Sequence, residues 1–226
     1  MASVCIDQSR SYIDKIVGHK ALRKDSNVGK VLVLDGFTTQ VVSNVYSQTE
    51  ILGKEFYLVE QLGAPHEPMP HLKAAVFVRP TASNVDILVR ELADPKFKEY
   101  HLFFSNVLSR NMLRSLAEAD DHEVVKQVHE FYGDYIAVNE DLFTLNIEKS
   151  LLLTGPSGTS LENASKFTQS VQGILAMLLS MKVEPSQIRY QGRSQVSASE
   201  SKIVVYISFS IINISSPDLD ASATFV

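Results

Sequence analysis

Cysteine and tryptophan are nearly absent from this chain. It has one cysteine, Cys5, and no tryptophan among its 226 residues. A single cysteine cannot form an internal disulfide or supply a cysteine-based zinc site, which fits a protein of a reducing compartment. The six histidines show no metal-ligand spacing. We therefore predict neither a bound metal nor a cofactor.

The chain also lacks an excess of basic residues and a long apolar segment. Its formal net charge is −5, whereas proteins that bind nucleic acids usually present a basic surface. The apolar run over residues 203–214 spans about a dozen residues, and a membrane-spanning helix needs about 20. Asp7 and Arg10 interrupt the N-terminal segment where a secretory signal would be apolar. We expect a cytoplasmic protein that binds no nucleic acid and does not insert into membranes.

What is present is a repeated alternation of apolar strands and amphipathic helices. Continuous apolar runs predict buried strands over residues 30–35, 56–62, 74–80, 100–106 and 124–132. Helical periodicity predicts helices over 3–17, 38–53, 83–93 and 109–118, with Ser83 as the N-cap of the third. Strands that alternate with helices indicate βαβ units. The fold class is therefore α/β, with a five-stranded, parallel, doubly wound, flavodoxin-like N-terminal domain.

The character of the chain changes after this alternation. We assign residues 1–138 to the first domain and residues 139–193 to the start of a second α/β domain that is incomplete. That second part carries a predicted helix over 161–183 and a predicted strand over 188–191. Residues 194–226 are expected to form an atypical, poorly ordered tail that contains the apolar run.

Asp35 closes the first predicted strand, where receiver domains and haloacid-dehalogenase-type phosphatases place a phosphorylated aspartate. The phosphatase loop needs a second carboxylate at the position of Phe37, and a receiver needs an acidic pair at the position of Ser26 and Asn27. The sequence thus leaves two interpretations of Asp35. It either caps the next helix, or it serves a phosphoryl-accepting or phosphatase-like enzyme, which is the alternative function.

Residues 99–135 read as a strand, a short amphipathic helix and a second strand. Leu108, Met112 and Leu116 repeat every four residues on one helix face, and Leu113 lies about 100° away, which widens the apolar surface. Acidic residues surround this surface: Glu118, Asp120, Asp121, Glu123, Glu130 and Asp134. This pattern has two interpretations. Either the apolar face packs on the sheet below a solvated acidic face, or it forms a notch beside a carboxylate that holds a short peptide.

Three sequence strings resemble one protein family. They are LFFSN (102–106), SLAEAD (115–120) and EVVKQVHEFYGDYIAVNEDLFTLNI (123–147). They resemble the SM proteins, the Sec/Munc regulators of SNARE assembly. Further matching strings are KVLVLD (30–35) and HLKAAVFVRPT (71–81). The resemblance covers about residues 10 to 193 and is specific, because long contiguous strings agree in order and spacing.

The resemblance implies a non-enzymatic, monomeric partner of syntaxin-type (Qa) SNAREs that regulates vesicle docking and fusion. It implies traffic between the trans-Golgi network, endosomes and the vacuole, and peripheral attachment to Golgi and endosomal membranes through the SNARE. In the family, an outer apolar pocket of the first domain binds the N-terminal peptide of the syntaxin. That pocket maps onto Leu108, Met112, Leu113, Leu116, Val128 and Glu130.

The resemblance also implies a second surface, an inner cleft that holds SNARE helices. Gln40, Ser47 and Glu60 correspond to part of this cleft face. The neuronal branch of the family carries basic residues at the positions of Gln40 and Ser47, so tight binding of a closed syntaxin is not expected here. After about residue 195 the chain departs from the family, whose members continue into a helical arch domain. We expect a C-terminally truncated form that binds at most the peptide.

Overall fold

The structure is a computed structural model, and it describes residues 4–23, 28–65, 67–139, 142–147 and 161–181. The chain forms two compact units. One contains residues 9–131, and the described part of the other contains residues 4–8 and 132–181. The observed division falls between Phe131 and Tyr132, and the domain boundary after residue 138 stays a prediction.

Residues 9–131 form a five-stranded parallel sheet with the strand order β2-β1-β3-β4-β5. This is the flavodoxin-like order, so the predicted fold class is confirmed. The C-terminal parts of the central strands are apolar and buried because both of their faces are covered. The strands are β1 (Lys30–Leu34), β2 (Phe56–Gln61), β3 (Met69–Val78), β4 (Phe97–Phe104) and β5 (Val125–Glu130).

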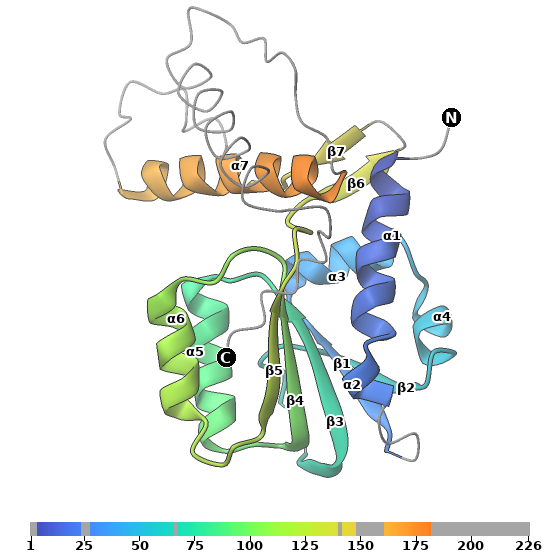
Figure 1. Cartoon of the computed structure of the whole chain (residues 1–226), viewed down its shortest axis with the longest axis vertical. Helices are drawn as coiled ribbons and strands as arrows, with labels where there is room; N and C mark the ends of the chain where they lie inside the picture. The colour runs from blue at the N-terminus through green and yellow to red at the C-terminus, as the bar shows by residue number, and fades with distance from the viewer. Residues whose placement is uncertain (1–3, 24–27, 66, 140–141, 148–160, 182–226) are drawn as a thin grey trace, which may run out of the picture. The chain divides into compact units, whose positions relative to one another are not determined.

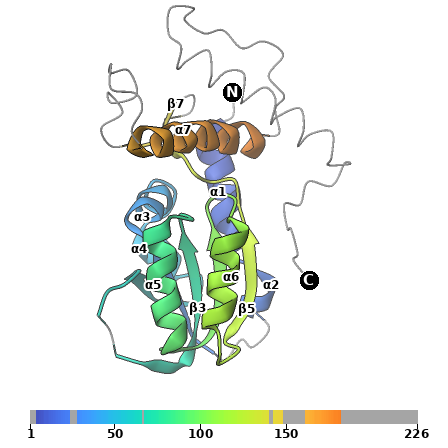
Figure 2. The ribbon, with the colours of Figure 1, turned by 90° about the vertical axis from the view of Figure 1, so that its left-hand side faces the viewer.

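Helices cover both faces of the sheet. α5 (Ala82–Ala93) and α6 (Arg110–Ala119) lie side by side on one face, while α1 (Val4–Val17) runs along the opposite face (Figures 1 and 2). The layer below α5 and α6 is built from apolar side chains that alternate along the strands. It includes Val31, Val33, Ala74, Val76, Val78, Leu88, Leu102 and Phe104. We call this the apolar layer.

Two expected helix boundaries are wrong. The single helix predicted over 38–53 is two helices, α3 (Gly36–Ser43) and α4 (Gln48–Leu52). The chain breaks because Ser47 and Glu50 form a reciprocal capping box that begins a new helix. The N-cap of α5 is Thr81 and not Ser83, since the Thr81 side chain accepts the backbone N–H of Asn84 at 3.2 Å. A short helix, α2 (Lys20–Arg23), follows α1.

The other unit contains an antiparallel strand pair and one long helix. β6 (Ile136–Asn139) pairs with β7 (Leu142–Thr144), and α7 spans Leu161–Ser180, close to its predicted range. Gly173 lets α7 approach the preceding segment, since a Cβ there would lie 2.5 Å from Leu145 Cδ2 and 3.2 Å from the Asp134 carbonyl oxygen. The strand pair was not predicted.

Several predictions fall on residues that the structure does not describe. The strand over 188–191, the end of the second domain and the tail over 194–226 with its apolar run all lie outside the described residues. Among the helices that are described, none is both long and apolar enough to cross a membrane.

Candidate functional site

Helix α6 connects β4 to β5, and polar side chains hold both ends of this connection. Ser109 is the N-cap of α6 and accepts the backbone N–H of Met112 at 3.3 Å. At the other end, the Asp120 carboxylate accepts the N–H groups of Val124 and Val125 at 2.8 and 3.0 Å, just as β5 begins. The helix is therefore fixed beside the edge strand of the sheet.

The structure divides the predicted apolar notch into a floor and a rim. Leu108 and Leu116 form the floor: both are buried, with exposed fractions of 8% and 3%, and belong to the apolar layer. Met112, Leu113 and Val128 form the rim: all three are half-buried and pack against that layer. The packing interpretation holds for Leu108 and Leu116, and the peptide-binding interpretation stays a prediction.

Glu130 ends β5 and joins it to the segment before α6. Its Oε1 accepts the backbone N–H of Leu108 at 2.6 Å. Burial raises the pKa of the Glu130 carboxyl, and the Leu108 hydrogen bond opposes this rise. Its other oxygen, Oε2, forms no hydrogen bond with the described residues. The carboxylate is therefore structural through Oε1.

The acidic residues around α6 do not act as one cluster. Glu118, Asp121 and Glu123 are exposed, as expected for a solvated face. Asp120 is half-buried because it caps the start of β5, and Asp134 is buried in the other unit. Of these residues, Glu130 is the carboxylate that lies next to the floor of the notch.

The predicted cleft-face residues lie around α3 and α4. Gln40 is exposed on α3, Ser47 is exposed at the N-cap of α4, and Glu60 is half-buried on β2. Ser47 is already engaged, since its backbone N–H and hydroxyl both donate to Glu50 Oε2 at 2.8 Å. Its position is thus set by the capping box, a signal that was readable in the sequence as Ser47-x-x-Glu50.

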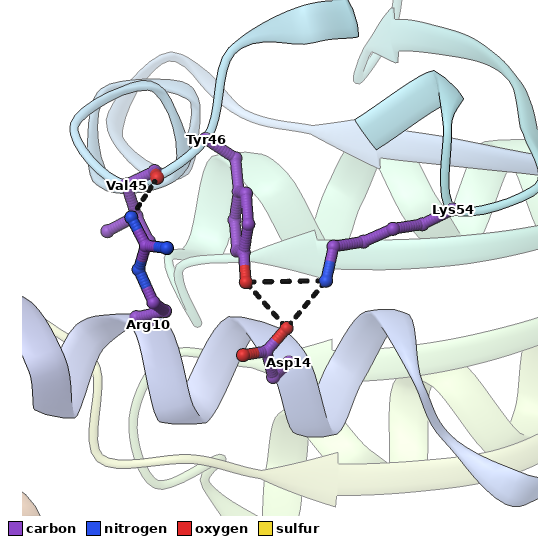
Figure 3. A network of polar contacts seen from close by, with 5 residues as sticks. All are labelled: Arg10, Asp14, Val45, Tyr46 and Lys54. Atoms are coloured by element: carbon purple, nitrogen blue, oxygen red, sulfur yellow. Dashed lines mark hydrogen bonds and ion pairs between the residues drawn. The ribbon is translucent and has the colours of Figure 1, made fainter. Parts of the chain in front are cut away.

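A polar network around Tyr46 fixes the corner between α3 and α4 (Figure 3). The Tyr46 hydroxyl donates to Asp14 Oδ1 at 2.6 Å, and Lys54 Nζ donates to the same oxygen at 2.8 Å. Arg10 donates to the Val45 carbonyl oxygen at 3.2 Å and lies 5.1 Å from the centroid of the Tyr46 ring. Sequence reasoning missed this network because its members are distant along the chain.

The electrostatics of this network favour the charged form of Asp14. Burial raises the pKa of Asp14, but hydrogen bonds from Lys54 and Tyr46 and the nearby charges of Lys54 and Arg10 outweigh it, so the pKa is lowered. A cavity of about 680 Å³ adjoins the network. Its lining combines two cations and two carboxylates with small residues: Asp14, Val17, Gly18, Lys30, Gly53, Lys54 and Glu55.

Asp35 is a helix cap with both carboxylate oxygens in use. Oδ1 accepts the N–H groups of Phe37 and Thr38 at 2.9 and 2.7 Å, and Oδ2 accepts the N–H of Arg79 and the side-chain amide of Asn84 at 2.7 and 2.6 Å. The side chain is buried, with 7% exposed. The capping interpretation is confirmed, and the geometry offers nothing to the phosphoryl-enzyme alternative, because a nucleophilic carboxylate needs an accessible oxygen.

The part of the chain that the structure describes brings no three His, Cys, Asp or Glu side chains into a metal-binding arrangement. What it presents on residues 9–131 is an apolar rim beside a half-buried carboxylate, and a separate polar surface at the α3–α4 corner. Both features suit binding of another polypeptide better than chemistry.

Comparison with known proteins identifies a family. The model of the Sec1 family matches residues 30–217. Vacuolar protein sorting-associated protein 45 of Rattus norvegicus is 47% identical over 190 residues, which cover 83% of this chain and 31% of that relative. The solved structure of the SM protein Vps45 matches with a TM-score of 0.83 and 37% identity, over 96% of this chain and 40% of that chain. The complex of Vps45 with the Qa SNARE Tlg2 matches with a TM-score of 0.83 and 36% identity, over 96% of this chain and 38% of that chain.

Proposed function

Because the chain belongs to the Sec1 family, we propose that it regulates vesicle docking and fusion by binding a syntaxin-type Qa SNARE. Support comes from the 47% identity to a vacuolar protein sorting-associated protein 45 and from the likeness to Vps45 solved with the Qa SNARE Tlg2. The protein acts in traffic between the trans-Golgi network, endosomes and the vacuole. It is a cytoplasmic, monomeric, non-catalytic binding protein that reaches Golgi and endosomal membranes through its SNARE.

The N-terminal peptide of the SNARE binds at the notch between α6 and β5. The observation that carries this proposal is the half-buried apolar rim of Met112, Leu113 and Val128 next to Glu130. An apolar anchor of the peptide packs on the rim, above the buried floor of Leu108 and Leu116. A basic group of the peptide meets Oε2 of Glu130.

Burial of the apolar anchor alone does not supply the free energy that micromolar binding requires. Burying one Leu or Phe side chain contributes roughly 2–3 kcal/mol. Micromolar affinity needs about 8 kcal/mol, so backbone and charged contacts must supply the larger part. Glu130 is suited to this task because it is half-buried, and a charge pair that is partly removed from water is stronger than a surface pair.

The exposed side of the α3–α4 corner, with Gln40 and Ser47, forms together with Glu60 of β2 part of a second surface that faces SNARE helices. This surface is suited to binding because it is rigid: the capping box and the Tyr46 network already fix the corner in the absence of a partner. Preorganised surfaces lose less entropy on binding. The neutral side chains of Gln40 and Ser47 limit its charge complementarity.

Calorimetric titration of a Qa SNARE N-terminal peptide into the full chain tests the peptide site. Wild type should bind with micromolar affinity. Leu113→Arg should weaken binding at least tenfold, because a charged side chain replaces the apolar rim. The matched control is Leu52→Arg, the same change at a leucine with 40% exposure at the end of α4, outside the notch. It should bind like wild type.

Glu130→Gln separates the two halves of the site. It should weaken a peptide with its basic group intact, and leave unchanged a peptide whose basic group is replaced by a neutral one. Equal heats for wild type and Leu113→Arg would remove the α6–β5 assignment, even if the chain binds the SNARE elsewhere.

A further inference from the structure

Three histidines gather on the face of the sheet opposite the apolar layer. His19 lies between α1 and α2, His101 on β4 and His129 on β5. The rings of His19 and His129 have centroids 4.7 Å apart, and both rings contact Phe103 with centroid distances of 5.5 Å. Because Gln127 and His129 pair with His101 and Phe103 in the β4–β5 register, these side chains share one face.

His101 is the most enclosed of the three. It is 1% exposed, and neither ring nitrogen has a hydrogen-bond partner among the described residues. The nearest carboxylate oxygen, Oε2 of Glu99, lies 3.8 Å from His101 Nε2 and 3.3 Å from Nζ of Lys73. The lysine therefore already offsets the charge of the carboxylate next to this histidine.

The other cations of this part of the unit are paired or exposed. On the same face, Lys30 is buried and pairs with Glu55 at 3.0 Å. On the helices, Lys15 of α1 and Lys20 of α2 are exposed to solvent. A proton on His19 or His129 would place a charge beside a second imidazole at a half-buried position.

We propose that His19, His101 and His129 form an acid-sensitive latch that holds the α1–α2 junction on the sheet near neutral pH and releases it in mildly acidic conditions. In the neutral state the rings pack as aromatic groups. In the protonated state His19 and His129 carry like charges at contact distance, and hydration of His19 relieves the repulsion. In this step the unprotonated ring nitrogens take protons from solvent and become N–H groups, and there is no other covalent change.

The expected direction of titration agrees with this geometry. Burial lowers the pKa of His19 and of His129, and nearby His19 lowers that of His129 further. Burial lowers the pKa of His101 to about 4. The packed state therefore favours neutral histidines, and any opening that hydrates them favours the proton-bound form.

Hydrogen exchange on the full chain at pH 7.5 and 5.5 tests the latch. Protection factors, which correct for the intrinsic exchange rate, should fall several-fold for the amides of residues 16–22, because opening hydrates two histidines that then bind protons more readily. Amides of α5 should keep their protection. His19→Gln with His129→Gln should remove the pH dependence at residues 16–22. The matched control, His71→Gln with His122→Gln, changes two exposed histidines and should leave the dependence intact.

Constant protection at residues 16–22 in wild type would overturn the proposal, and so would an equal loss in α5, which indicates global unfolding. If the double variant does not fold, proton NMR titration of the wild-type imidazoles decides. The latch requires that His19 and His129 titrate clearly below about 6.5, the usual histidine value. Titration of both at that value would overturn it.

Discussion

The two faces of the five-stranded sheet bury different chemistry. Toward α5 and α6, the strands contribute the apolar layer, which is built of aliphatic and aromatic side chains. Toward α1, the same strands contribute Lys30, Lys73, Glu99 and His101, which we call the polar layer. The face toward α1 also buries apolar side chains such as Leu32, Phe77 and Phe103, so both layers are stabilised by packing, and the polar layer adds a dependence on charge balance and pH.

The largest effect is expected in the apolar layer. Leu88→Ala removes a side chain of α5 that is fully buried, and should lower the free energy of unfolding by about 3 kcal/mol through lost burial and a cavity. Urea denaturation measures the change. Leu52→Ala, at a half-exposed leucine, should cost far less. A loss at Leu88 no greater than at Leu52 would show that the apolar layer is loosely packed and would weaken the contrast between the faces.

A smaller loss is expected from the buried ion pair of the polar layer. Lys73→Met keeps the aliphatic stem but leaves the Glu99 carboxylate, 19% exposed, without its cation. The free energy of unfolding should fall by about 2 kcal/mol at pH 7.5. Adding Glu99→Gln should recover most of this loss, because no uncompensated charge stays behind. If the double variant is as unstable as Lys73→Met alone, then Lys73 stabilises the fold through packing of its ammonium group and not through its charge.

Changing the pH distinguishes the two layers directly. The folded-state pKa of His101, about 4, lies below its unfolded value, so its contribution to stability is fully present above about 6.5 and is lost as the pH falls toward 4. Between pH 7 and 5.5 this amounts to about 1 kcal/mol. Leu88→Ala should keep the same pH dependence, and His101→Leu should reduce it to the part that comes from His19 and His129. Equal slopes in His101→Leu and wild type would assign the dependence to other groups.

The smallest effect is expected at the network in Figure 3. Tyr46→Phe removes the hydroxyl that donates to Asp14 but keeps the ring beside Arg10 and Lys54. Because Asp14 and Lys54 are partly exposed, the loss should be only about 0.5 kcal/mol. Tyr57→Phe, at a tyrosine with 78% exposure, should leave stability unchanged. A loss of several kcal/mol would mean that the corner carries much more of the stability than its exposure indicates.

The strands of the sheet could be predicted from the sequence because a parallel sheet requires continuous apolar runs. The break between α3 and α4 was missed, although Ser47 and Glu50 stand at capping-box spacing, because the apolar periodicity continues across it. The start of β3 was placed at residue 74, whereas the strand begins at Met69. The sequence did not predict this extension because proline is rarely found inside a strand, and Pro70 lies within it. The β3–β4 register is irregular between Met69 and Lys73.

For the candidate site, periodicity and family resemblance together pointed to six residues, but neither gave their exposure. Leu108 precedes α6 and is nevertheless buried, because the carboxylate of Glu130 fixes its N–H from across the notch. That contact joins residues 22 positions apart and leaves no local signal in the sequence. The histidine cluster was hidden for the same reason, since its members come from a helix junction and two strands.

One ring contact joins the two ends of the sheet-forming unit. Tyr12 of α1 packs edge-on against Phe131, which follows β5, with ring centroids 5.8 Å apart. During translation α1 is made first, and Phe131, the aromatic partner of Tyr12, is made only after the last strand of the sheet. A nascent chain that ends before residue 125 therefore holds α1 without this contact and leaves β4 with one unpaired edge until β5 is made.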